Sequence, residues 1–297
     1  MAKKKNKEIV RKIISVVSVI GFLLCTAVLL YPVISDRWNR YRDMKLITEY
    51  NRTIENTSED DKADILKRAK DYNDYLRSQN RNIVTDAEYE PDDYYETLLS
   101  LKKNGMIGYV EIPKIDITEP VYHYSTDISL GKGVGHIHGS SLPTGGINTH
   151  SVLTGHRGLP NQKFFSDLDK MEIGDKFYIH VLGTVLAYRV CNIQTISPYD
   201  VGSLMIEEGK DLVTLVTCTP YGVNTHRLLV TGTRIEFSQK DVKDGLVTTE
   251  HHQIRIDPAI WVLAGFLLFI IIFALVSIIR KKIYRKRHLK GGKNETT

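Results

Sequence analysis

A cysteine and an arginine nine positions apart are the residues of this 297-residue chain best suited to nucleophilic chemistry. Cys218 follows the apolar, β-branched run 212–217, and Arg227 comes after the turn-forming segment 219–222, Thr-Pro-Tyr-Gly. A cysteine attacks a carbonyl carbon as the thiolate, so a base or a cation must lie beside it. A strand end suits such a side chain, because a rigid sheet can aim it into a groove.

His156 is the candidate base, and it lies upstream in the segment 153–157, Leu-Thr-Gly-His-Arg. Taken alone, a histidine between glycines is more often a turn residue than a base. A lone strand-end cysteine is likewise more often inert, so it is the set of three that indicates chemistry. His226 is an alternative imidazole. It alternates with Arg227 along a strand, so we expect Arg227 to face the site and His226 to face away.

Three blocks of sequence, found in this order, resemble the sortase family. They are 107–113 (Ile-Gly-Tyr-Val-Glu-Ile-Pro), 149–160 (Thr-His-Ser-Val-Leu-Thr-Gly-His-Arg-Gly-Leu-Pro) and the segment from Cys218 to Arg227. The resemblance covers roughly residues 36–236 and is strongest to the class C, or pilin-polymerising, sortases.

The resemblance implies a role for each of the three residues. Cys218 would be the nucleophile. His156 would protonate the leaving amine and then deprotonate the incoming one, since one group must give and recover the same proton. Arg227 would hydrogen-bond the tetrahedral oxyanion or the substrate backbone.

From Ile107 onward the sequence is patterned as strands. Short β-branched or aromatic runs recur, and seven or more of them within about 130 residues predict a barrel or a sandwich. With the resemblance, the expected fold class is mostly β: a sortase-type closed β-barrel with N-terminal helices and two flanking transmembrane helices. The runs are 109–112, 117–122, 149–154, 176–182, 185–196, 212–217 and 227–237, with Gly183-Thr184 as a tight turn.

Two long uncharged runs, 13–34 and 259–279, can each cross a bilayer core, which takes about 20 helical residues. A cleaved signal peptide is the alternative for the first run, but the run is too long and lacks a small-residue cleavage site. Residues 1–12 carry a formal charge of +5 and residues 280–297 one of +7, so both ends are expected in the cytoplasm. The segment between them carries −7, and the basic total gives no support for nucleic-acid binding.

The chain is therefore expected to have seven regions. It is predicted to be a multi-pass protein of the cell membrane with an extracellular catalytic domain and cytoplasmic termini, in a Gram-positive bacterium by the resemblance. The regions are a cytoplasmic tail 1–12, a transmembrane helix 13–34, a helical region 35–105, the catalytic barrel 106–240, a linker 241–258, a transmembrane helix 259–279 and a cytoplasmic tail 280–297.

The region 35–105 is predicted to contain two helices, separated near 56–61, with Ser58 as the N-cap of the second. The polar segment 77–93 is either a solvated loop or, by the resemblance, a lid over the active site. The class C lid carries an Asp-Pro-aromatic motif. Asp86 and Tyr89 are the candidate lid residues here, although the proline is missing and the ring is displaced by one position.

No cofactor or metal is predicted. His136 and His138 could begin a zinc site on one strand face, but no third ligand, HExxH or paired CxxC motif accompanies them. Three cysteines give no even disulfide framework. Cys191 is expected to be buried on a strand, and the sequence leaves open its pairing with Cys218.

The predicted function is that of a membrane-anchored cysteine transpeptidase. By the resemblance, Cys218 attacks the Thr-Gly bond of an LPXTG-like sorting signal, forms a thioacyl enzyme and passes the acyl group to a pilin lysine to build covalent pili. The expected partners are pilins or other surface proteins with C-terminal sorting signals, and the lipid bilayer. The alternatives are a sortase that attaches proteins to peptidoglycan, a membrane-tethered cysteine protease, and a scaffold with a degenerate site, against which the intact set of three residues argues.

Overall fold

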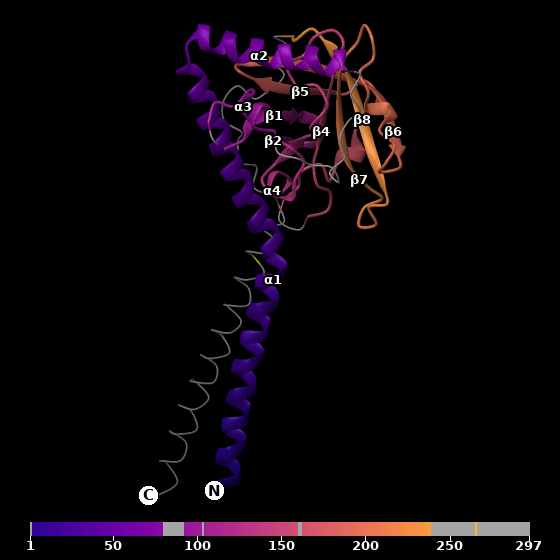
Figure 1. Cartoon of the computed structure of the whole chain (residues 1–297). Helices are drawn as coiled ribbons and strands as arrows, with labels where there is room; N and C mark the ends of the chain where they lie inside the picture. The colour runs from indigo at the N-terminus through magenta and orange to yellow at the C-terminus, as the bar shows by residue number, and fades with distance from the viewer. Residues whose placement is uncertain (1, 80–91, 103, 160–161, 239–264, 266–297) are drawn as a thin grey trace, which may run out of the picture. The chain divides into compact units, whose positions relative to one another are not determined.

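The described chain folds around a closed barrel of eight strands, which a computed structural model shows over residues 2–79, 92–102, 104–159, 162–238 and 265 (Figure 1). The strand order around the barrel is β1-β2-β3-β4-β7-β8-β6-β5. This confirms the mostly-β closed barrel. The strands are β1 Met106–Ile112, β2 Ile117–His123, β3 Val134–His136, β4 Thr149–Thr154, β5 Lys176–Val181, β6 Thr184–Ile196, β7 Asp211–Thr219 and β8 His226–Ile235.

Seven of these strands were predicted from β-branched runs, and β3 was missed. It contains three residues, which is too short for an alternating pattern to be recognised, and it is defined by its pairing with β2 and β4. The β5–β6 turn also differs from the prediction by one residue. Val181 pairs with Thr184, so the turn residues are Leu182 and Gly183, both with the positive φ that such tight turns require.

Two of the pairings in the barrel are parallel, and one of them joins β4 to β7. Thr149 lies beside Asp211 and Thr154 beside Val216, so the two strands begin and end at the same edges of the barrel. β7 then pairs with β8 in the antiparallel sense, as far as Thr219 opposite His226. The carboxyl ends of β4 and β7 and the start of β8 therefore meet at one edge.

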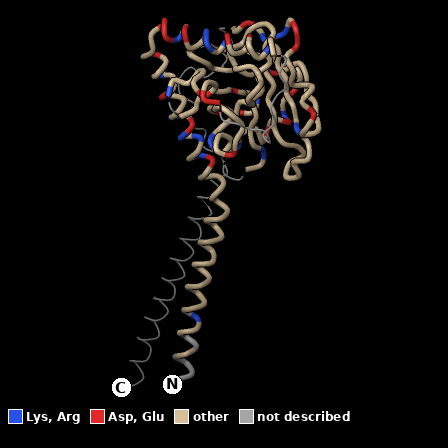
Figure 2. The backbone as a smooth tube through the Cα atoms, in the orientation of Figure 1, with Lys and Arg blue, Asp and Glu red and all other residues tan. Residues whose placement is uncertain are grey.

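The N-terminal region differs from the prediction, since the span 13–34 and the helix expected after it form one continuous helix. α1 runs from Ala2 to Glu55, and Pro32 lies within it. Among the described residues it is the one helix long and apolar enough to cross a membrane. An 18-residue window within Ile9–Glu55 has a mean hydropathy of 2.8, and none of that window is buried. Figure 2 shows a long stretch of α1 below the barrel in tan, without Lys, Arg, Asp or Glu. The expected second span 259–279 and the flanking tail lie outside the described residues.

The upper part of α1 packs against the barrel through apolar side chains. Ile47, Tyr50 and Ile54 form a buried cluster with side chains of β1 and β2. The Tyr50 hydroxyl donates to the carbonyl of Ile107 and accepts from the amide of Leu182, both at 3.1 Å. One side chain of α1 thereby satisfies two backbone groups of the barrel.

Two further helices complete the N-terminal region. α2, Glu59–Ser78, begins at the predicted N-cap, since the Ser58 side chain accepts from the amide of Asp61. It crosses the top of the barrel in Figure 1, where Asn73 exchanges hydrogen bonds with the backbone of Leu142. Short elements follow: α3 Asp93–Thr97, α4 Asp127–Leu130, and the 3-10 turns η2 Pro113–Ile115, η3 Leu168–Lys170 and η4 Gly202–Leu204.

The Tyr50 hydroxyl provides a test of how α1 is held. We expect Tyr50→Phe to lower the free energy of unfolding of the barrel by about 1–3 kcal/mol, because it leaves the amide of Leu182 buried without its acceptor. Thermal unfolding of the full-length chain in detergent micelles measures the change. Tyr41→Phe is the matched control on the same helix, since the Tyr41 side chain is 60% exposed. Equal melting temperatures for the two variants would contradict this account of the contact.

Candidate active site

Cys218 and Arg227 lie directly opposite each other on neighbouring strands. The antiparallel register pairs Cys218 of β7 with Arg227 of β8 and Thr219 with His226. Opposed residues in an antiparallel pair project from the same face, and the next residue projects from the other. The register therefore puts Arg227 on the Cys218 face and His226 on the opposite one, and the alternation of the strand predicted these opposite faces. Both Cys218 and Arg227 are half-buried, whereas His226 is exposed.

The face that carries Cys218 is the outer face of the barrel. Val213 and Leu215 of β7 point into the central core, so Thr214, Val216 and Cys218 alternate to the outside. Val216 accordingly belongs to a separate apolar cluster with Val152, Leu204 and Leu229, against which Ile137 and Ile196 pack. Cys218 thus lies at the end of a strip of apolar side chains outside the central core, and this strip is itself buried.

His156 reaches the same edge through the parallel pairing. Thr154 lies beside Val216, and the Gly155 amide continues the ladder by donating to the carbonyl of Val216 at 3.1 Å. The Thr217 hydroxyl donates back to the carbonyl of Gly155 at 2.8 Å. His156 and Cys218 are therefore each two residues beyond a matched pair, at the same edge of neighbouring strands.

The segment after His156 folds back against it. The Phe165 amide donates to the carbonyl of His156 at 3.1 Å, and the rings of His156 and Phe164 are 6.4 Å apart between centroids. The Phe165 ring lies so close to Gly155 that a Cβ there would approach it to 2.9 Å. Glycine at 155 is thus required by packing, and the backbone of His156 is held from two sides.

Arg157 is a residue of the site to which the sequence analysis assigned no role. Its Nη1 donates to the Thr219 hydroxyl at 3.1 Å and to the carbonyl of Cys218 at 3.5 Å, while Nη2 pairs with the Asp169 carboxylate. The guanidinium also stacks over the Tyr221 ring at 5.8 Å. Its side chain is only 7% exposed, so it fastens the segment carrying His156 to the strand carrying Cys218. Its one sequence signal is its position next to His156.

The Arg227 guanidinium lies over the β7–β8 turn. Its Nη1 donates to the carbonyls of Asn224 at 3.3 Å and His226 at 3.2 Å. No carboxylate partner of Arg227 is found within the described residues, so its charge is not neutralised by an ion pair there. A guanidinium with this freedom can offer its other N–H groups to a substrate oxygen.

A cavity of about 370 Å³ opens along the outer face beyond the apolar strip. It is lined by His150 of β4, by Leu204, Met205 and Ile206 between β6 and β7, and by Leu76 and Arg77 at the end of α2. Leu204 belongs to both the cavity and the apolar strip. The cavity therefore borders the buried strip at Leu204.

The histidines 136 and 138 form part of a packed aromatic cluster. His136 bonds Tyr95 Oη at 2.6 Å through Nδ1 and the carbonyl of Ser141 at 2.8 Å through Nε2. Burial lowers the pKa of His136 to about 3. The described residues contain no group of three ligands that could hold a metal ion.

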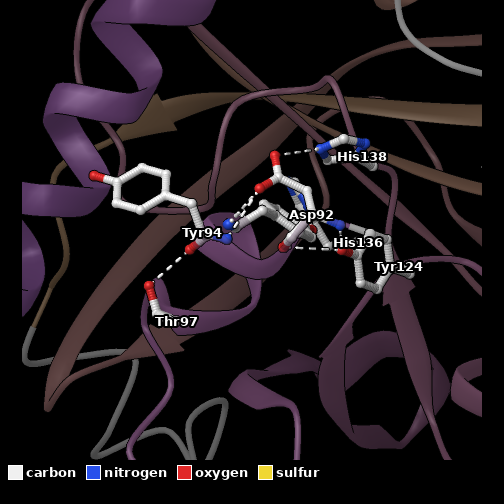
Figure 3. Close-up of polar contacts among 7 residues, drawn as sticks. Asp92, Tyr94, Thr97, Tyr124, His136 and His138 are labelled. Atoms are coloured by element: carbon white, nitrogen blue, oxygen red, sulfur yellow. Dashed lines mark hydrogen bonds and ion pairs between the residues drawn. The ribbon is translucent and has the colours of Figure 1, made fainter. Parts of the chain in front are cut away.

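Asp92 joins this cluster from the chain segment that leads into α3. It caps α3 by accepting from the amides of Tyr94 and Tyr95 at 3.0 Å, and its carboxylate lies 3.7 Å from His138 Nε2 (Figure 3). The Tyr124 hydroxyl accepts from the Asp92 amide at 2.8 Å. The cluster fixes the position of α3 on the barrel.

The candidate lid residues, Asp86 and Tyr89, lie outside the described residues. Cys191 was expected to be buried, and this is wrong, because it is exposed; neither Cys191 nor Cys218 forms a disulfide. The reason is a β-bulge between Val190 and Asn192, where the register shifts and Cys191 leaves the ladder.

Comparison with known proteins gives consistent results. A model of the sortase domain matches residues 110–235. The chain is 42% identical to a Streptococcus pneumoniae sortase C structure, covering 65% of this chain and 97% of that one with a TM-score of 0.60. For Streptococcus agalactiae sortase C1 the identity is 42%, the coverages are 65% and 100%, and the TM-score is 0.61.

More distant relatives include sortases of another class. The chain is 29% identical over 160 residues to sortase A of Staphylococcus aureus, covering 52% of this chain and 76% of that protein. Identity to the sortase C structures is higher and extends over nearly their whole length. The chain therefore belongs to the sortase family and, within it, to class C.

Proposed function

We propose that the chain is a membrane-anchored transpeptidase that cleaves an LPXTG-like sorting signal and transfers it to a lysine of a pilin. The observation that carries the proposal is the register of β4, β7 and β8, which brings His156, Cys218 and Arg227 to one edge of the barrel. The S. pneumoniae sortase C to which the chain is similar has been described in terms of pilin substrate specificity.

The reaction follows from these three side chains. The Cys218 thiolate attacks the threonine carbonyl carbon, and Arg227 donates hydrogen bonds to the oxyanion or to the substrate backbone beside it. The C–N bond to glycine breaks as His156 protonates the leaving amine. A lysine amine then attacks the thioester, gives its proton to His156, and the C–S bond breaks to restore the thiolate.

The outer face supports a peptide substrate. An extended peptide advances about 3.3 Å per residue, so the four residues that precede the scissile bond span about 13 Å. Within that length of Cys218, Ile196 lies beside Arg227 on the neighbouring strand, and Ile196 and Ile137 are half-buried side chains that pack on the buried strip. Apolar residues of a sorting signal can contact Ile137 and Ile196 there.

The apolar part of α1 supports attachment to the membrane. Its side chains are exposed along a stretch that is long and apolar enough to cross a membrane. We infer that α1 anchors the barrel outside the cell membrane of a Gram-positive bacterium, with the N-terminus in the cytoplasm.

The first test is the covalent intermediate. We expect the full-length chain, incubated in detergent micelles with a panel of LPXTG-type peptides, to gain the mass of the peptide minus its leaving fragment. Cys218→Ala should gain no mass and should lose at least ~10³-fold in turnover, because the nucleophile is gone. Intact-mass spectrometry measures the adduct. An adduct of equal yield on Cys218→Ala would contradict the assignment.

The neighbouring residues Arg227 and His226 provide a paired test of the oxyanion role. Arg227→Ala should lower the rate of acyl-enzyme formation by ~10²–10³-fold, because one such donor is typically worth that much. His226→Ala should remain within about twofold of the parent, since its side chain lies on the opposite strand face. A larger loss for His226→Ala than for Arg227→Ala would reverse the assignment of the two residues.

The acceptor decides between the pilin function and its relatives. A lysine-bearing pilin domain should accelerate product release from the acyl enzyme and appear in an isopeptide-linked product by mass spectrometry. A cross-bridge peptide that is joined in preference would show a wall-attaching sortase. Release at an unchanged rate with either amine would show a protease, in which water resolves the intermediate.

A further inference from the structure

Two buried carboxyl groups and one amide connect α1 to the segment that packs against His156. Gln162 Nε2 donates to Asp43 Oδ2 of α1 at 2.6 Å and to Glu119 Oε2 of β2 at 3.3 Å. The three residues are 5%, 1% and 8% exposed, so solvent is nearly excluded from them. This cluster joins three parts of the chain that are separated by 76 and 43 residues in sequence.

Gln162 is close in sequence to the contacts that hold His156. Three residues after it, the Phe165 amide donates to the carbonyl of His156, and Phe164 places its ring beside the imidazole. Phe164 and Phe165 are both fully buried. A displacement of Gln162 is therefore transmitted to the backbone and the ring face of His156 through a short, packed segment.

The cluster of Asp43, Glu119 and Gln162 does not serve to stabilise the folded state at neutral pH. Burial raises the pKa of Asp43 to about 6, and burial together with the Asp43 charge raises the pKa of Glu119 well above its ordinary value. A carboxyl whose pKa is raised on folding favours the folded state at low pH and loses that contribution as the pH rises through the folded-state pKa. At neutral pH these groups therefore weaken the fold, whereas apolar side chains of similar volume could pack there without that penalty.

The cluster instead fixes the position of the segment that contains Gln162. The amide of Gln162 fits between two acceptors on two different elements, so only one placement of the segment satisfies both hydrogen bonds. Two arginines on α1 partly offset the effect of burial on these pKa values. Arg42 contacts Asp43 at 3.2 Å and lowers its pKa, and Arg40 lowers the pKa of Glu119. The charged and titratable groups around Asp43 are Asp36, Arg40 and Arg42 on α1, Glu119 and Tyr122 on β2, and Asp116, which pairs with Arg40.

We propose that Gln162, held between Asp43 and Glu119, is a positioning residue that keeps His156 in place beside Cys218 and ties it to α1. This inference rests on the proposed role of His156 in proton transfer. It adds that the same helix proposed to anchor the barrel in the membrane also sets the position of the catalytic imidazole.

A charge exchange tests the proposal. Gln162→Glu places a third carboxyl against Asp43 and Glu119 and should displace the segment. Misplacement of a reacting group by about 1 Å can cost ~10²-fold, so we expect kcat to fall by ~10- to 10²-fold with KM within about twofold. The loss should grow as the pH rises from 5 to 8, because the neighbouring carboxyls ionise and repel the introduced carboxylate more strongly.

The double variant Asp43→Asn/Gln162→Glu is the matched rescue. It exchanges the amide and the carboxyl between the two positions and so keeps two carboxyls and one amide in the cluster. We expect kcat to return to within about threefold of the parent and the added pH dependence to disappear. Tyr50→Phe is the control for loosened docking of α1, because it breaks hydrogen bonds to β1 and to the β5–β6 turn and none to this segment. It should keep the parental kcat at temperatures below its melting point.

Hydrogen exchange of the Phe165 amide, followed in the full-length chain in micelles, separates this proposal from the proposed function. Exchange should be faster in Gln162→Glu and parental in the double variant, whether or not a peptide substrate has been found. If the parent forms no acyl enzyme with any peptide, the proposed function fails. The exchange rate of the Phe165 amide then tests by itself whether Gln162 positions the segment that holds His156. Parental exchange in Gln162→Glu, a parental kcat, or a loss that the double variant does not restore would each overturn the positioning role.

Discussion

The parallel pairing of β4 with β7 is the constraint on which the candidate site depends. Because the two strands start together at Thr149 and Asp211, they also end together, and the residues just beyond Thr154 and Val216 are neighbours. An antiparallel pairing would have placed the ends of β4 and β7 at opposite edges of the barrel. The short β3, which pairs with β2 in parallel and with β4 in antiparallel fashion, sets the direction of β4 and so makes this arrangement possible.

The three candidate catalytic residues are held in different ways. Cys218 and Arg227 belong to one antiparallel ladder, so their separation is fixed by the hydrogen bonds of the barrel itself. His156 lies beyond the end of its strand and depends on contacts made by side chains from elsewhere, among them Arg157, Phe164 and Phe165. His156, the candidate proton-transfer residue, is therefore the member of the set whose position other parts of the chain can adjust.

The sequence predicted the features that depend on local patterns. Seven strands, the N-cap at Ser58 and the placement of Arg227 and His226 on opposite strand faces follow from alternation or capping, whereas the closed barrel was expected from the family resemblance. It did not predict what depends on contacts between distant segments. No local signal marks Arg157 as the link between two strands, or Gln162 as the partner of Asp43, 119 residues away. The exposure of Cys191 was missed for the same reason, since a bulge is defined by the register of the partner strand.

The contact of Gln162 with Asp43 depends on the continuity of α1. Had the apolar stretch ended in a flexible linker after Ile34, the barrel and that stretch would move independently. In this chain one helix extends from the span to Glu55, and within two turns it contributes Asp43, Ile47 and Tyr50 to the barrel. The apolar contacts and the Tyr50 hydrogen bonds supply the attachment, while Asp43 supplies an ionisable contact whose energy favours one geometry rather than greater stability. Attachment and positioning are thus carried by different side chains of the same helix, so one can be altered by substitution while the other is kept.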